Sequence, residues 1–349
     1  MVCMRIGAGL DSRLGLPFAG LRQAGHEAAI LGFESLWTPA LGVPDPFHVC
    51  AAWAQDAPLV TGISVVPAPR LWRPLALAMQ AATVGQISDG RFILGIGTGG
   101  YGPAFWASVG LPDRPLAVMR DYLTVLRGLL GGDAVTYEGP ALSVRNASLG
   151  SRDLPDVPLY LGALGPQMLR LAGELADGAL LNWATPDRIA QSRAIVAEGA
   201  AKAGRDPRNV ALTMYVRVCV DDDVAAARQA LGRQVLGYAM TMPGTPPAAG
   251  YRGLFASMGF GDILTELEER RGRGEDLDAL VAAAPDELLT SVGYYGPAAG
   301  APEAFARLSA GLDETIVRVI TTRPGADKVV ATLQALTPDR IRAAAEDLG

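Results

Sequence analysis

The chain has 349 residues, half of them hydrophobic, so it can form a large packed core and shows no compositional sign of disorder. Thirty Lys and Arg against 36 Asp and Glu give a net charge of −6, which argues against a nucleic-acid-binding protein. No segment reaches the roughly 18 uninterrupted apolar residues of a membrane span. Charged residues interrupt the N-terminus, and three scattered cysteines form no disulfide framework. We therefore expect a cytoplasmic protein with neither membrane nor nucleic acid as partner.

Short β-branched apolar segments alternate with helical segments along the chain. Strands are expected at 4–10, 33–37, 59–66, 91–97, 157–162, 178–182, 210–220 and 315–320. Helices are expected at 17–31, 46–55, 74–88, 115–130, 166–176, 186–203, 223–238 and 327–347. Several strands lack polar alternation, as is typical of parallel strands covered on both faces. This α/β pattern predicts one (β/α)8 TIM barrel domain over residues 1–349, with an open doubly wound sheet as the alternative.

One segment departs from this alternation. Residues 240–300 contain a Pro- and Gly-rich stretch, a charged helix and a second Gly-rich stretch. They fall between the seventh and eighth expected strands, on the side where barrel loops build active sites. We predict that they are an insertion near the active-site face.

Two glycine-rich loops follow expected strands. Gly95, Gly97 and Gly100 match the G-x-G-x-x-G spacing of dinucleotide-binding loops, but residues 101–103 continue as a loop instead of opening a helix. A Rossmann site is therefore not expected, although such a loop still lets backbone N–H groups approach an anion. Residues 162–166 lead into a helix whose N-terminal N–H groups suit a phosphate. Two such loops favour a phosphate-bearing cofactor; a role in chain geometry alone is the alternative.

Side chains for acid–base, nucleophilic or metal chemistry are scarce. His26 and His48 both fall in expected helices, and His48 and Cys50 are too close in sequence to share a helix face as metal ligands. The acidic residues 221–223 are most simply a solvated first helical turn. No metal site is predicted, and the catalytic residues stay unknown. This pattern suits a reaction whose chemistry a cofactor carries, such as direct hydride transfer.

Two segments carry a family resemblance. Residues 73–99 read RPLALAMQAATVGQISDGRFILGIGTG, and residues 158–182 read PLYLGALGPQMLRLAGELADGALLN. Both resemble the luciferase-like monooxygenase superfamily, with a looser match around 251–260. The first segment should form a helix that begins at Pro74. We expect its buried stripe to contain Leu75, Met79, Ala82 and Ile87.

Within that superfamily the chain is most similar to the branch that uses the deazaflavin coenzyme F420; the branch that uses FMN shares the fold. The resemblance implies a non-prolyl cis peptide at Ser64–Val65, against the flavin ring. A Cβ at Gly165 is expected to crowd the backbone of the second anion-binding loop. The expected cofactor-binding residues are Trp37, Ser64, Val65, Gly97, Thr98, Gly99, Ala163, Leu164, Gly165, Pro166 and Asn182.

The chain also departs from family patterns. Residues 38–41 lack the acidic residue and histidine that often follow the tryptophan equivalent to Trp37, and Gly100 stands where related sugar-phosphate dehydrogenases have Glu. No acid–base residue can be carried over. The polar and aromatic residues that could take a role instead, or serve packing alone, are Tyr101, Trp183, Tyr215, Arg217 and Tyr251.

The expected function is F420-dependent hydride transfer to or from a small organic substrate by a homodimeric oxidoreductase. One alternative is an FMN-dependent two-component monooxygenase that uses O2 and a separate flavin reductase. An alternative of another class is a flavin-binding barrel without catalysis.

Overall fold

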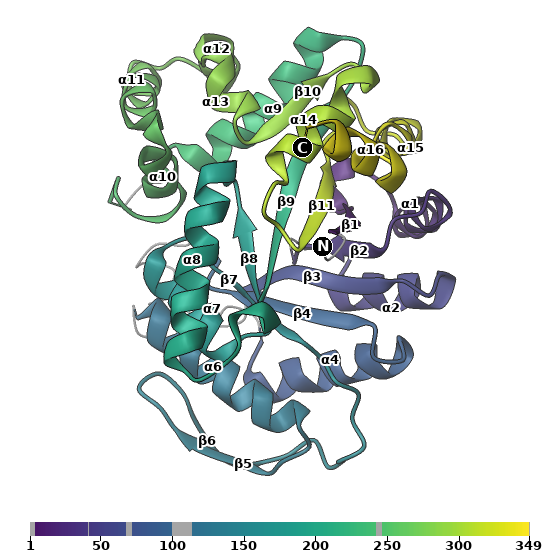
Figure 1. Ribbon diagram of the computed structural model, residues 1–349, viewed down its shortest axis with the longest axis vertical. Coiled ribbons are helices and arrows are strands. Elements are labelled where there is room, and N and C mark those ends of the chain that lie inside the picture. The colour runs from purple at the N-terminus through teal and green to yellow at the C-terminus, as the bar shows by residue number, and fades with distance from the viewer. Residues whose placement is uncertain (1–3, 41, 68–71, 100–113, 242–245, 349) are drawn as a thin grey trace. The chain divides into compact units, whose positions relative to one another are not determined.

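The computed structural model describes residues 4–40, 42–67, 72–99, 114–241 and 246–348. They fall into two compact units, which are described separately (Figure 1). Unit 1 comprises Met1–Phe33, Asn182–Gln191 and Met214–Gly349. Unit 2 comprises Glu34–Leu181 and Ser192–Thr213. Leu41, Gly100 and Tyr101, named in the sequence analysis, lie outside the described residues.

Unit 2 has a parallel sheet in the order β2–β3–β4–β7–β8, with helices after its strands. The strands are β2 (Ser35–Thr38), β3 (Val60–Pro67), β4 (Phe92–Gly97), β7 (Leu159–Gly162) and β8 (Gly178–Asn182). The helices are α2 (Pro46–Asp56), α4 (Pro74–Ile87), α6 (Pro115–Leu130), α7 (Pro166–Leu175) and α8 (Pro186–Lys202). All five begin at a proline, whose fixed φ and missing N–H suit a first helical turn.

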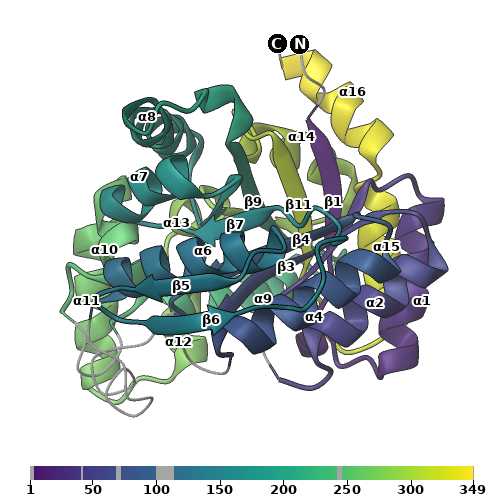
Figure 2. The same ribbon diagram turned by 90° about the horizontal axis from the view of Figure 1, so that it is seen from below.

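A β-hairpin that the sequence analysis missed follows α6. Its strands are β5 (Val135–Glu138) and β6 (Ser143–Ala147), shown in Figure 2. Asp121 of α6 is fully buried and accepts hydrogen bonds from the Tyr137 hydroxyl at 2.7 Å and the Ala141 N–H at 2.8 Å. The hairpin escaped prediction because its strands have only four and five residues, so the short alternation in β5 gave little signal.

Unit 1 contains the strand order β10–β9–β11–β1. Its strands are β1 (Arg5–Gly9), β9 (Ala211–Val220), β10 (Gly293–Gly296) and β11 (Glu314–Val319). The helices α1 (Phe18–Ile30), α9 (Val224–Ala239), α14 (Ala301–Leu308), α15 (Ala326–Ala335) and α16 (Pro338–Leu348) accompany them. One helix was expected over 327–347, but the chain leaves the helix at Leu336, two residues before Pro338, which starts α16.

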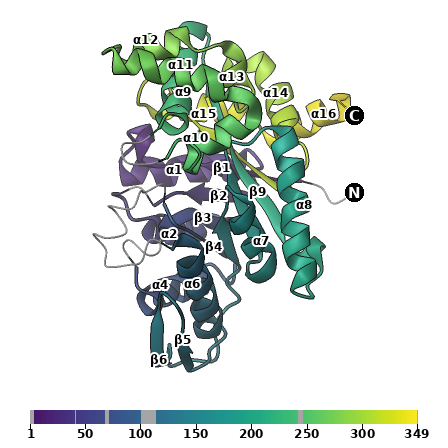
Figure 3. The same cartoon turned by 90° about the vertical axis from the view of Figure 1, so that its left-hand side faces the viewer.

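The segment between β9 and β11 is mostly helical (Figure 3). Beyond α9 it contains α10 (Gly250–Phe255), a π-helical turn (Ala256–Phe260), α11 (Gly261–Gly272), α12 (Leu277–Ala283) and α13 (Asp286–Thr290). It then adds β10, which was not expected and pairs in parallel with β9 from Arg217 to Val220. That residues 240–300 are an insertion, and that 1–349 are one domain, remain predictions.

Eight strands followed by helices within the described residues, namely β1, β2, β3, β4, β7, β8, β9 and β11, identify the fold as a (β/α)8 TIM barrel. The fold prediction is confirmed. No helix in the described ranges has the length and apolar character needed to cross a membrane.

The expected buried stripe of α4 is wrong. Leu75, Met79 and Ile87 are 40%, 56% and 37% exposed, and of the four only Ala82 is buried. The buried side of α4 consists mainly of Leu77, Ala78, Ala81, Val84 and Gly85. Small residues allow the close packing of this side, so the larger apolar side chains are left on the outer surface of the helix.

Candidate active site

An irregular point in β3 forms the centre of the unit 2 site. The peptide bond between Ser64 and Val65 is cis, which confirms the predicted geometry. The register between β3 and β4 shifts between Ile63 and Val66, so Ser64 and Val65 bulge out of the ladder. Both side chains are half-buried.

Glycines on the two neighbouring strands accommodate this bulge. A Cβ on Gly97, at the end of β4, would lie 2.8 Å from Val65 Cγ2. A Cβ on Gly162, at the end of β7, would lie 3.1 Å from Val65 Cγ1. A Cβ on Gly97 would force Val65 to move, and a Cβ on Gly162 would be in unusually tight contact with it. The ends of β3, β4 and β7 therefore pack closely around Val65, and we call this region the platform.

The first loop continues from β4 into Thr98 and Gly99. Gly99 has a φ of 71°, in the left-handed region that glycine adopts without steric cost. The Thr98 hydroxyl donates a hydrogen bond of 3.0 Å to the carbonyl of Gly99. This loop adjoins the platform through Gly97.

The second loop joins β7 to α7. Ala163 is held by its N–H, which donates to the carbonyl of Leu180 at 3.1 Å, while Leu164 and Gly165 are half-buried. Gly165 is the N-cap of α7 and Pro166 its first residue, without a side-chain cap. The next N–H groups of the helix start are therefore available to an anion. The expected crowding at Gly165 is wrong, because a Cβ there would have no atom within 4 Å.

Trp37 differs from the other expected cofactor residues. It is fully buried in β2, its ring lies against Gly62 and 6.2 Å from the ring of Tyr160, and its indole N–H donates to Ser35 Oγ at 3.0 Å. These contacts indicate a packing role. Its proximity to a bound ring stays a prediction.

Unit 1 contains a polar cluster centred on Asn182, the last residue of β8. The amide of Asn182 accepts a hydrogen bond from Arg217 Nη1 at 2.6 Å and donates one to the Tyr251 hydroxyl at 2.8 Å. Arg217 comes from β9 and Tyr251 from α10. Of the residues named from the sequence, the structure brings together Asn182, Trp183, Arg217 and Tyr251.

Aromatic rings surround this cluster. The guanidinium carbon of Arg217 lies 3.7 Å from the centroid of the Trp183 ring and 5.4 Å from that of Tyr238. Tyr238 packs edge-on against Tyr251, with 4.8 Å between centroids. Trp183 has a φ of 55°, a conformation that costs energy for a bulky residue and is found mainly at functional sites.

A second buried arginine belongs to unit 1. Arg318 of β11 donates from Nη2 to Asp11, just after β1, and its guanidinium lies 5.1 Å from the ring of Tyr215. Gly9 is needed nearby, because a Cβ there would lie 2.9 Å from the Tyr215 ring. The guanidinium of Arg13 bonds Tyr238 at 3.4 Å and lies 3.5 Å from Asp11.

Burial and charge shift several ionisation equilibria in this unit. Burial lowers the pKa of Arg217, and it lowers that of Arg318 to about 9. We treat both side chains as cations, because the guanidinium group stays protonated in proteins. Burial also raises the pKa of Tyr251 to about 12. At Tyr238, burial acts in the same direction, but the nearby Arg217 and Arg13 outweigh it and the pKa is lowered.

Several members of the cluster were missed from the sequence: Asp11, Arg13, Tyr238 and Arg318. The first two were considered only as charges that interrupt an apolar N-terminus. Arg318 was a lone charge in an apolar strand, an unusual placement that could have marked it as functional. Tyr238 gave no signal at the end of an ordinary helix.

The acidic run 221–223 is only partly a solvated helix start. Asp223 caps α9 by accepting from the Ala226 N–H. The Asp221 side chain is 10% exposed, and it accepts from Lys328 Nζ at 2.7 Å and the Thr322 hydroxyl at 2.6 Å. In the described part of the chain, no group of three His, Cys, Asp or Glu residues could hold a metal ion.

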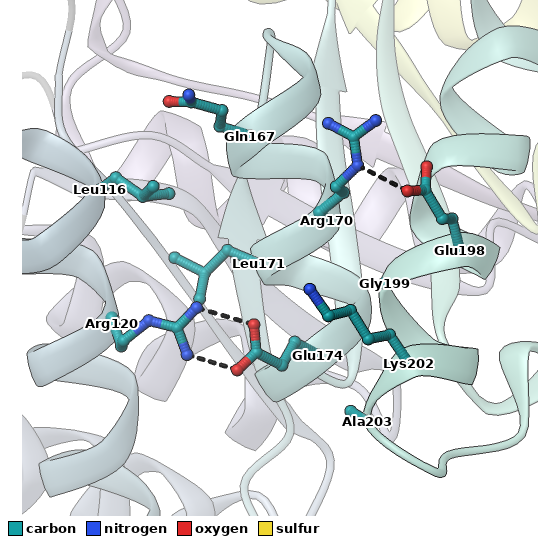
Figure 4. A pocket seen from close by; sticks show the side chains of 10 residues that line it. All are labelled: Leu116, Arg120, Gln167, Arg170, Leu171, Glu174, Glu198, Gly199, Lys202 and Ala203. Carbon is teal, nitrogen blue, oxygen red and sulfur yellow. Dashed lines mark hydrogen bonds and ion pairs between the residues drawn. The ribbon is translucent and has the colours of Figure 1, made fainter.

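A cavity of about 520 Å³ lies elsewhere in unit 2, lined by α6, α7 and α8 (Figure 4). Arg120 pairs with Glu174 through its two terminal nitrogens, Nη1 and Nη2. Arg170 Nε donates a hydrogen bond to Glu198 at 3.0 Å. These arginine charges are therefore already compensated by carboxylates on neighbouring helices. The cavity lies among the helices and not at strand ends, so we do not assign it to the active site.

Among known protein families, the sequence profile of the luciferase-like monooxygenase family matches residues 2–315. The chain belongs to this family. The predicted family membership is confirmed.

Two reductases of the same name are similar to this luciferase-like chain. The 5,10-methylenetetrahydromethanopterin reductase of Methanolobus tindarius is 32% identical over 201 residues, which cover 57% of this chain and 61% of that protein. The reductase of the same name from Archaeoglobus fulgidus is 30% identical over 263 residues, 74% of this chain and 72% of that protein. The match to the first thus spans less than two thirds of its length.

The fold is also that of a solved relative. The coenzyme F420-dependent tetrahydromethanopterin reductase from Methanopyrus kandleri superposes with a TM-score of 0.76 at 23% identity. The superposition covers 96% of this luciferase-like chain and 99% of that one. At this identity, the likeness establishes the shared barrel fold.

Proposed function

We propose that the protein is an oxidoreductase that uses coenzyme F420 and transfers a hydride to or from a small organic substrate. The observation that supports this proposal most directly is the platform around Val65, where Gly97 and Gly162 leave room for the bulge in β3. Similarity to the F420-dependent glucose-6-phosphate dehydrogenase of Microbacterium testaceum, 32% identical over 177 residues, supports the deazaflavin over FMN.

The residues of unit 2 fit such a cofactor. The half-buried Val65 and the backbone at Gly97 and Gly162 offer a flat apolar surface for a ring. The loop at Thr98 and Gly99, with the open helix start at Gly165, offers backbone N–H groups to an anionic tail. The space beside Gly165 is open, since a Cβ there would have no atom within 4 Å, and the helix start is therefore accessible.

When bound, the deazaflavin supplies a ring carbon that accepts or donates the hydride. The protein's own contribution is to bind and orient. Fixed backbone donors hold the anionic tail without reorganisation, and the apolar platform excludes water from the ring face. Holding two reactants in reactive geometry is worth about 7–11 kcal/mol, so no covalent bond from a protein side chain is needed.

A pair of variants at Gly165 tests the cofactor assignment. Gly165→Asp places a carboxylate at the anion site and should weaken F420 binding about tenfold or more, because like charges repel. Gly165→Asn has the same shape without charge and should bind F420 nearly as the wild type does. Both residues are good helix N-caps, so neither variant should lose stability. Equal F420 affinity of the folded Asp and Asn variants would refute the assignment.

Spectra and isotopes separate the alternatives. Titration with F420 and with FMN, followed by absorbance, identifies the cofactor that binds. Turnover with deuterium-labelled reduced F420 should transfer the label into product. Turnover that requires O2 and a separate flavin reductase would replace our proposal with an FMN monooxygenase. Tight cofactor binding without turnover on a broad substrate panel would favour the non-catalytic barrel.

We also propose a homodimer through the outer surface of α2 and α4. Leu75, Met79 and Ile87 leave an apolar stripe exposed there, beside a hollow of about 360 Å³ lined partly by Phe47 and Ala51. An apolar stripe of this kind is typical of an interface between copies. Light scattering should give a dimer mass for the wild type and for Ile30→Glu, an exposed control on α1. Met79→Glu should give a monomer; a dimeric Met79→Glu would contradict this surface.

A cytoplasmic location is proposed from the cysteines. Cys50 and Cys219 are free and buried, and burial raises the pKa of both thiols, that of Cys219 to about 12. Unpaired thiols are typical of a reducing compartment. Cell fractionation tests this location.

A further inference from the structure

Arg217 is a buried charge that the protein does not neutralise. The side chain is 4% exposed, and its hydrogen bonds go to neutral groups, the amide of Asn182 and the hydroxyl of Tyr238. Among the described residues it forms no ion pair with a carboxylate within 4.0 Å, and aromatic rings cover it. Burying an unpaired charge is costly, so such an arrangement persists where a function requires it.

Other buried arginines of unit 1 follow the opposite rule. Arg318 is 5% exposed and pairs with Asp11. Arg252 is 7% exposed and lies 3.2 Å from Glu268. The same unit therefore provides carboxylates for buried guanidiniums elsewhere. This contrast makes the missing counterion of Arg217 specific to its site.

The cluster also contains an unsatisfied donor. The indole Nε1 of Trp183 is buried and has no hydrogen-bond partner among the described residues. Trp183 is the residue whose ring lies under Arg217 and whose backbone has a φ of 55°. A cation without a carboxylate partner and an N–H donor without an acceptor point to a ligand that brings a negative oxygen.

We propose that Arg217 binds the carboxylate of an organic acid substrate, and that Trp183, Tyr238 and Tyr251 contact its flat apolar body. This inference rests on the proposed oxidoreductase function. One guanidinium already partly engaged by Asn182 suits a singly charged planar anion better than a phosphate, which generally meets several cations. Asn182, Tyr238 and Tyr251 are half-buried, so a ligand can reach the cluster from solvent.

Acid and amide pairs test the charge requirement directly. Benzoate with benzamide, and cinnamate with cinnamamide, are titrated calorimetrically into the full-length protein without cofactor. At least one acid should bind about tenfold or more tightly than its amide, the difference expected of a charge-assisted hydrogen bond. Arg217→Gln should abolish this preference. The matched control Arg307→Gln removes an exposed arginine of the same unit and should retain it.

Stability provides a second readout that needs no ligand. Arg217→Met removes a charge without a counterion, so its thermal midpoint should equal or exceed that of the wild type. Arg318→Met leaves Asp11 buried without its partner and should melt at a lower temperature. If Arg217→Met were destabilised as much as Arg318→Met, Arg217 would be a structural residue and the proposal would be wrong.

The remaining outcomes are separable. Equal binding of every acid and its amide, or an acid preference that survives Arg217→Gln, overturns the carboxylate assignment. Loss of F420 affinity in Arg217→Gln would reassign the residue to the cofactor and also overturn it. Failure of the wild type to bind F420 refutes the proposed function instead, while the acid preference is measured independently of it.

Discussion

The glycine platform of unit 2 and the polar cluster of unit 1 are built by opposite means. The platform depends on side chains that are absent, because a Cβ on Gly97 or Gly162 would press on Val65 at 2.8 or 3.1 Å. The cluster depends on charged and aromatic side chains packed against one another, with Arg217 over Trp183, and the same unit pairs Arg318 with Asp11. The platform presents backbone, whereas the cluster presents a charge and aromatic rings. Under our proposals, the first binds the cofactor and the second selects the substrate.

The two constructions should respond differently to change. Substitutions in the platform act through steric overlap, which neither pH nor salt relieves. Substitutions in the polar cluster act through charge, so their effects depend on the partner that is left and on the state of protonation. The predictions below use this difference.

The largest effect is expected at Gly95 in β4. A Cβ there would lie 2.2 Å from the carbonyl oxygen of Ile63 and 2.5 Å from Leu180 Cδ1, and the backbone oxygen cannot rotate away. Gly95→Val should therefore cost more than about 5 kcal/mol and prevent folding at any pH. Gly165→Ala, where a Cβ meets nothing within 4 Å, should unfold in urea like the wild type. A folded Gly95→Val of wild-type stability would contradict the close packing.

A smaller effect is expected from Asp11→Asn. The change retains the hydrogen bond from the Arg13 N–H but leaves the buried Arg318 without a carboxylate. We expect a loss of about 3 kcal/mol in the free energy of unfolding, measured in urea at pH 7. Asp327→Asn, which breaks the exposed pair with Arg323, should cause no measurable loss. Equal losses of unfolding free energy in Asp11→Asn and Asp327→Asn would show that burial does not strengthen the contribution of an ion pair.

The smallest effect is a pH-dependent one at Asp221. Hydrogen bonds from Lys328 and Thr322 lower the pKa of its carboxyl from 3.8 to about 2. A lowered pKa in the folded state stabilises the protein above the unfolded value, and the contribution is lost as pH falls from about 4 towards 2. Asp221→Asn should thus cost about 1–2 kcal/mol at pH 7 and little near pH 2. A stability difference independent of pH would contradict the ion pair.

The predictable parts of the molecule share a local cause. Pro74 and Pro166 begin helices because proline fits a first turn wherever it occurs, and the apolar strands alternate with helices as a barrel requires. The glycine-rich loops after β4 and β7 were found because glycines at strand ends are visible in sequence; their cofactor role stays a prediction. The hairpin at β5–β6 was not found, since a buried Asp121 on α6 and not its own apolar pattern anchors it.

The sequence by itself determined the barrel, the family and the glycine-rich ends of β4 and β7, because these depend on periodicity and on residues whose backbone preferences are intrinsic. Only the tertiary structure decided which side of α4 is buried, since a helix apolar on both sides carries no signal for either. It also decided that Asn182, Arg217, Tyr238 and Tyr251 meet, although they come from four separate elements. Whether a charged side chain forms an ion pair depends on its neighbours in space, and residues far apart in the sequence supply those neighbours.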